Sequence, residues 1–89
     1  MHVRIHPHAA SRIEIRGATE DEVIQTVLTG ECFPAKHGRT GFRRNFTGSF
    51  AWRGRAFDTK QLEVYAVFED SGWLAITVIV KFLLTRDMR

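Results

Sequence analysis

The sequence predicts a single α+β domain over residues 1–89, with two N-terminal helices packed on a four-stranded, mostly antiparallel sheet. Three observations predict it. The first third of the chain has two segments of helical periodicity, and the rest has runs of alternating apolar and polar residues. Turn residues separate those runs. A chain of 89 residues also leaves room for one core only.

The N-terminal segment predicts a possible short strand followed by a helix. Apolar and polar residues alternate over His2–His6, which places Val3 and Ile5 on one face. Pro7 suits the first turn of a helix, where its missing N–H costs nothing. We expect this helix over Pro7–Arg16, followed by Gly17 in a left-handed conformation.

A second helix is predicted over Glu20–Thr29. Thr19 and Glu22 have the spacing of a capping box, and acidic residues in the first turn favour the helix dipole. Apolar residues then recur at helical spacing, and Gly30 ends the helix.

The remaining chain predicts an antiparallel meander. A strand begins at Phe42, has a bulge or turn at Thr47–Ser49, and ends at an Arg53-Gly54 turn. Leu62–Phe68 alternates clearly, and residues 69–72 form a hairpin turn. The last strand, Trp73–Phe82, is apolar on nearly both faces, so we expect it to be central and partly covered by the helices.

Composition excludes several classes of protein. With 44% hydrophobic and 26% charged residues the chain is not disordered, and it is too short for a dinucleotide-binding fold. Cys32 is the only cysteine, so an internal disulfide and a cysteine metal site are excluded. We expect Cys32 to be a small buried hydrophobe. His2, His6 and His8 lack a companion ligand at good spacing, so we expect neither a metal nor a cofactor.

The N-terminus has no segment typical of a signal peptide, and the longest near-apolar run, Trp73–Val80, is too short to span a membrane. We therefore expect a soluble cytoplasmic protein that does not engage a membrane.

The net charge of +3 is unevenly distributed. Three basic and five acidic residues precede Lys36, and three basic and four acidic residues follow Lys60. The middle third has one acidic residue and seven basic ones, which are Lys36, Arg39, Arg43, Arg44, Arg53, Arg55 and Lys60. Aromatic residues are interleaved with them, a pattern typical of nucleic-acid binding. The alternative is that the aromatic side chains are core and the basic ones lie on the solvated face of the strands.

Several short motifs resemble domain-of-unknown-function family 4258. They are His8-Ala9-Ala10-Ser11-Arg12, the run from Arg16-Gly17 to Glu22-Val23, Ala35-Lys36-His37-Gly38-Arg39, Lys60-Gln61-Leu62-Glu63-Val64, and Ile76-Thr77-Val78. Together they cover almost the whole chain. The resemblance implies a relation to RelE/ParE-like toxins and other small metal-independent ribonucleases. It therefore implies a two-helix, four-strand core, an RNA substrate and an antitoxin partner.

Metal-independent RNA cleavage needs an acid/base group and cations that stabilise charge on the phosphate. Histidine exchanges protons near neutral pH, which makes His8 the candidate acid/base group. Arg12 and Arg16 could clamp a phosphate. Related ribonucleases often have a polar or basic residue on the final strand, which adds Thr77 and Lys81 as candidates.

Each of these residues also has a structural interpretation. His8 could cap a helix or lie on the surface, and the two arginines could pair with Glu14 or Glu20. Thr77 could be an ordinary strand residue and Lys81 a solvated charge. The alternative function is accordingly a non-catalytic RNA- or protein-binding module that uses the basic strip Arg39–Arg55. Such a module could form a homodimer.

Overall fold

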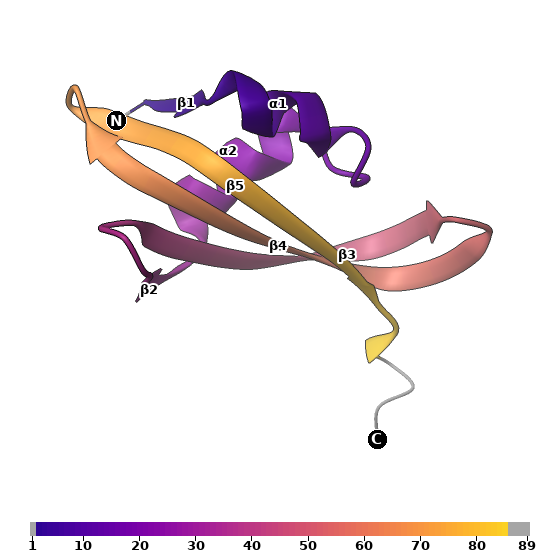
Figure 1. The fold of residues 1–89 in the computed structure, drawn as a ribbon. Coiled ribbons are helices and arrows are strands. Elements are labelled where there is room, and N and C mark those ends of the chain that lie inside the picture. The colour runs from indigo at the N-terminus through magenta and orange to yellow at the C-terminus, as the bar shows by residue number, and fades with distance from the viewer. Residues whose placement is uncertain (1, 86–89) are drawn as a thin grey trace.

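The computed structural model of the protein describes residues 2–85. The chain runs through β1 (Val3–Ile5), α1 (Pro7–Ile13), α2 (Glu20–Thr29), β2 (Glu31–Pro34), β3 (Thr40–Trp52), β4 (Arg55–Glu69) and β5 (Gly72–Leu83). The strands form one mixed sheet in the order β1-β5-β4-β3-β2, and only the β1–β5 pair is parallel (Figure 1). The predicted α+β class is confirmed, with five strands in place of four.

The second helix has the predicted bounds, and its capping box is complete. The Thr19 hydroxyl accepts a hydrogen bond from the Glu22 N–H at 3.1 Å, and the Glu22 carboxylate accepts one from the Thr19 N–H at 2.9 Å. Both donors would otherwise lack a partner within the helix.

The first helix is shorter than predicted, because it ends at Ile13 and not at Arg16. Gly17 is left-handed, as expected, with φ of 84°. A Cβ atom on Gly17 would lie 2.8 Å from the ring of Trp52, so the chain turns closely against that ring. The N–H groups of Gly17 and Ala18 donate to the carbonyls of Glu14 and Ile13, at 3.0 Å each, and this Schellman pattern ends the helix in a tight turn.

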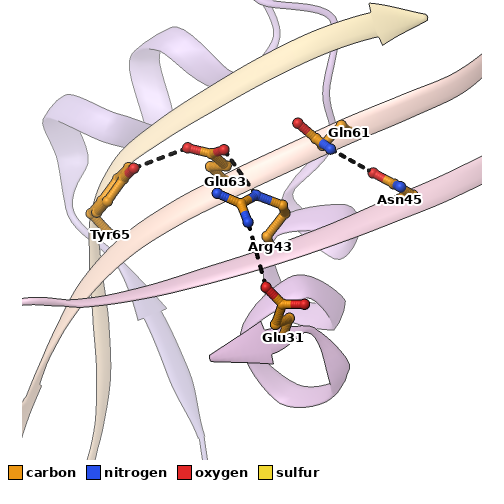
Figure 2. A network of polar contacts seen from close by, with 6 residues as sticks. All are labelled: Glu31, Arg43, Asn45, Gln61, Glu63 and Tyr65. Carbon is orange, nitrogen blue, oxygen red and sulfur yellow. Dashed lines mark hydrogen bonds and ion pairs between the residues drawn. The ribbon is translucent and has the colours of Figure 1, made fainter. Parts of the chain in front are cut away.

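One face of the sheet carries the core. Leu62, Val64 and Ala66 of β4 are fully buried beneath the helices, together with Val23 of α2 and Val78 of β5. Helix α1 packs on β5, while α2 packs on β4 and β3. The opposite face, which we call the open face, is not covered by a helix within residues 2–85. Its side chains include Arg43, Glu63 and Tyr65 (Figure 2).

The predicted turns and bulge are present. The pairs Arg53-Gly54 and Asp70-Ser71 all have positive φ, which suits two-residue hairpin turns. The pairing of β3 with β4 shifts register between Thr47 and Phe50, at the predicted bulge. The β3–β4 hairpin extends beyond the helices at its tip (Figure 1).

The strands and Cys32 differ from the sequence-based expectation in three respects. β4, not β5, is the central strand, and β1 covers the outer side of β5 only over Trp73–Ala75. Strand β2 was not predicted, because four residues after a helix carry too little periodicity. Cys32 is exposed and not buried, because β2 is the outermost strand of the sheet. Among residues 2–85 there is no helix with the length and apolar character needed to cross a membrane.

A buried ion pair joins α2 to the central strand. The Lys60 side chain is 10% exposed, and its Nζ lies 3.1 Å from both carboxylate oxygens of Glu22. The ammonium also lies 4.9 Å from the ring centre of Phe50 and 5.6 Å from that of Phe82. Two rings thus border a charge that is largely removed from water, and its remaining compensation comes from Glu22.

Removing one partner of this pair should destabilise the protein strongly. We expect Lys60→Met to lower the free energy of unfolding by about 3 kcal/mol or more, because Glu22 is left largely buried without its counterion. The double variant Lys60→Met/Glu22→Gln should recover much of that loss. Urea denaturation measures the free energy of unfolding of the wild type, the single variant and the double variant. The control Arg4→Ala removes an exposed pair with Asp70 and should change stability by less than about 1 kcal/mol. A Lys60→Met loss no larger than that of the control would contradict the interpretation.

Candidate functional site

A cavity of about 190 Å³ lies between α1 and β5. We call it the α1–β5 cavity. The side chains lining it come from two separate segments, namely His8, Ala9, Arg12 and Arg16 from α1 and the turn after it, and Ile76, Thr77 and Val78 from β5. The fold therefore brings together four of the five residues predicted to act in catalysis.

Helical spacing and a free strand edge position the basic side chains. His8 and Arg12 lie one turn apart on α1. The turn continues to Arg16, whose N–H donates to the Arg12 carbonyl at 3.1 Å. The Arg16 guanidinium donates to the backbone carbonyl of Val78. That carbonyl is accessible because β1 pairs with β5 only as far as Ala75.

His8, Arg12 and Arg16 have few side-chain contacts within the protein. His8 is not the helix cap, because His6 has that role and its Nδ1 accepts the His8 N–H at 3.1 Å, but His8 does lie exposed on the surface. Neither Arg12 nor Arg16 forms an ion pair with Glu14 or Glu20 within residues 2–85. The side chains of His8 and Arg12 make no hydrogen bond to other described residues, so they are available to a ligand.

Lys81 does not line this cavity. It is exposed on the open face, in register with Gln61 of β4. It lies four positions beyond Thr77 along an extended strand, a span of about 13 Å. The positive charge of Lys81 instead helps to lower the pKa of Glu63.

The seven basic residues of the middle third do not form one surface. Lys36 and Arg39 lie in the turn between β2 and β3. Arg43 is on the open face, whereas its neighbour Arg44 is on the helix-covered face, because successive side chains of a strand alternate. Arg53 and Arg55 flank the tip of the β3–β4 hairpin, and Lys60 is buried.

Most of these charges also have partners inside the protein. The Arg43 guanidinium lies 3.0 Å from the Glu63 carboxylate and 3.4 Å from that of Glu31. Arg44 donates to the Thr29 hydroxyl at 2.8 Å. Arg53 and Arg55 lie over the rings of Trp52 and Phe57. Lys36 and Arg39 differ from them, because no hydrogen bond, ion pair or ring contact engages their side chains in the described part of the chain.

In comparisons with known proteins, no family model, curated protein or solved structure matches the chain. Inference about the site therefore depends on its geometry and on the sequence motifs.

A second cavity, of about 420 Å³, lies at the open face beside the β2–β3 turn. We call it the open-face cavity. Phe33 and Tyr65 line it together with Lys36, His37, Arg39 and Thr77. Thr77 lines both cavities, so the two adjoin at β5. Sequence reasoning missed Phe33 because it missed β2. The alternation of Leu62–Phe68 did place Tyr65 on the face opposite the core, but it did not indicate which residues of other strands line the cavity with Tyr65.

A hydrogen-bonded network also crosses the open face (Figure 2). The Tyr65 hydroxyl donates to the Glu63 carboxylate at 2.9 Å, and Arg43 donates to the same carboxylate at 3.0 Å. Burial alone would raise the pKa of Glu63. Hydrogen bonds from Tyr65 and Arg43, and the charges of Arg43 and Lys81, outweigh it and hold that pKa below 4.5, its ordinary value. The hydrogen bond to Glu63, followed by burial, raises the pKa of Tyr65.

Because the pKa of Glu63 is lowered, we expect its carboxylate to contribute to the pH dependence of the free energy of unfolding. A carboxylate whose pKa is lower in the folded state adds stability above pH 4.5, and this contribution is lost as the pH falls through the folded-state pKa. Glu63→Gln should therefore unfold more easily at neutral pH and lose less stability than wild type as the pH falls below 4.5. Denaturation curves across this pH range measure the difference. Parallel pH dependences for the two proteins would contradict the prediction.

Proposed function

We propose that this protein cleaves RNA without a metal ion, using the α1–β5 cavity as its active site. One observation carries the proposal: His8, Arg12 and Arg16, from α1 and the turn after it, line the same cavity as Thr77 of β5, which is remote from them in sequence. An imidazole beside two guanidinium groups supplies the proton transfer and the phosphate charge stabilisation that such cleavage needs.

In this proposal His8 takes the proton from the ribose 2′-hydroxyl. The 2′-oxygen attacks the adjacent phosphorus, the bond from phosphorus to the 5′-oxygen breaks, and the 5′-oxygen takes a proton from water. The protonated His8 then returns its proton to the hydroxide that is left. The products are a 2′,3′-cyclic phosphate and a 5′-hydroxyl. Arg12 and Arg16 stabilise the charge that develops on the phosphate oxygens.

The contacts of Arg16 favour this role. Its hydrogen bond to the Val78 carbonyl fixes the guanidinium against β5. A guanidinium has five N–H donors, so one backbone contact leaves others for phosphate oxygens. The Thr77 hydroxyl, on the neighbouring strand residue, can orient the substrate by a hydrogen bond.

The motif resemblance to family 4258 supports the same proposal, and through it a relation to RelE/ParE-like toxins with an antitoxin partner. This relation stands as part of the proposal. The modest net charge of +3 also agrees with local phosphate contacts better than with a broad nucleic-acid surface.

Cleavage of RNA in EDTA tests the proposal. We expect His8→Ala to lower the rate by about a hundredfold, since general acid/base groups contribute on that order. Arg12→Ala should also slow cleavage, whereas Arg4→Ala, which removes a guanidinium on β1 outside both cavities, should cleave at the wild-type rate. Background-level cleavage by wild type, or equal rates for wild type and His8→Ala, would refute the proposal.

A second candidate function is a protein-binding module, favoured by the free edge of β5. The Val78 carbonyl points away from β4, and residues two apart on a strand share this direction. The N–H and carbonyl of Val80 therefore point outward too, where no strand covers them within residues 2–85. Such an edge can pair with a strand of a second copy of the chain.

Val80→Pro tests this second candidate, because proline removes only an outward-pointing N–H and is tolerated on edge strands. If two copies pair along β5, light scattering should give the mass of a dimer for wild type and of a monomer for Val80→Pro. A monomeric wild-type protein would rule out pairing between copies.

A further inference from the structure

The open-face cavity has the size and walls of a binding site for a small aromatic ligand. Its volume of about 420 Å³ falls within the usual range for ligand pockets. Its lining combines two aromatic rings with the cationic side chains of one turn, and it contains no carboxylate. This combination suits a ligand that is both aromatic and anionic.

The aromatic walls are held in place by neighbouring strands. The rings of Phe33 and Tyr65 meet edge to face, with centres 6.1 Å apart. Phe33 lies against Gly41, where a Cβ atom would come within 2.3 Å of the ring. The Tyr65 hydroxyl is tied to Glu63, which Arg43 holds in turn. The rings are therefore positioned before any ligand arrives, which lowers the entropy that binding must overcome.

The cationic rim comes from the short turn between β2 and β3. His37 and Gly38 both have positive φ, and the Arg39 N–H donates to the Lys36 carbonyl at 3.3 Å. This turn gathers the side chains of Lys36, His37 and Arg39 at one side of the cavity. None of the three is engaged by a carboxylate among the described residues, unlike Arg43 and Lys60, so their donors are available to phosphate oxygens.

Thr77 connects this cavity to the proposed active site, because it lines both. We infer that the open-face cavity binds the base of a nucleotide in single-stranded RNA, next to the phosphate that Arg12 and Arg16 contact. Lys36 and Arg39 contact the following phosphate. This inference rests on the proposed function, since it specifies that the RNA cleaved at the active site is single-stranded.

Single strands are favoured over duplexes for a physical reason. A base can enter an aromatic-lined pocket only if it is unstacked and unpaired, which costs little in a flexible single strand. Ring stacking has little dependence on the identity of the base, so weak sequence preference follows.

The test separates binding from cleavage. The probe is a fluorescent hexanucleotide RNA with 2′-O-methyl riboses, which cannot be cleaved because the attacking hydroxyl is blocked. Its affinity is measured by fluorescence anisotropy. We expect Phe33→Leu and Arg39→Ala each to weaken binding about tenfold, consistent with the usual loss from removing one stacking ring or one phosphate contact. The control Arg4→Ala loses the same charge as Arg39→Ala outside the cavity and should bind as wild type does. The matching duplex should bind at least about tenfold more weakly than the single strand.

The outcomes distinguish this inference from the proposed function. If His8→Ala leaves cleavage unchanged while Phe33→Leu and Arg39→Ala weaken binding, the active-site proposal fails and the base-binding cavity stands. If cleavage depends on His8 but both cavity variants bind as wild type does, the inference is overturned. Equal affinity for duplex and single strand also overturns it. Circular dichroism checks folding, and Arg39→Ala, which alters a turn and not the core, decides the matter if Phe33→Leu unfolds.

Discussion

The buried ion pair of Lys60 and Glu22 is the interaction on which the arrangement of the two layers depends. Glu22 completes the capping box that begins α2, and its carboxylate also accepts the ammonium of Lys60 from β4. One side chain thus sets both the start of the helix and its position over the sheet. The ring of Phe82 borders both this pair and the turn before α2, because its centre lies 5.6 Å from the Lys60 ammonium and one of its atoms would lie 2.9 Å from a Cβ atom on Gly17. The same turn joins α2 to Arg16 and α1, and α1 packs on β5.

The two faces of the sheet have different physical tasks. Beneath the helices, apolar side chains of β4 and β5 are buried and give the fold its stability. On the open face, charged and aromatic side chains satisfy one another through the network of Arg43, Glu63 and Tyr65 (Figure 2). Both cavities meet where these faces adjoin the edge of β5, at Thr77. A ligand there can contact rigid strands, a helix and a turn at once.

The basic residues divide into those that stabilise the protein and those that remain available to a ligand. Lys60 and Arg43 are held by carboxylates, and Arg44 by a hydroxyl. The side chains of Lys36, Arg39, His8 and Arg12 have no such partners within residues 2–85. The available charges lie around two adjoining cavities, which argues for local contacts with a few phosphates. This differs from the continuous basic strip that the spacing of the middle third had suggested.

The sequence by itself determined the α+β class, the bounds of α2, both hairpin turns, the bulge and the buried face of β4, because capping, left-handed turns and alternation are local properties. It also indicated His8, Arg12, Arg16 and Thr77, whose spacing on a helix and a strand is local. Only the tertiary structure decided that β4 is central, that Cys32 is exposed on β2, and that Lys60 is buried against Glu22. Only it brought Phe33, Tyr65 and the turn at Arg39 into one cavity. These depend on strand order and on pairing between residues remote in sequence, which hydrophobic periodicity does not encode.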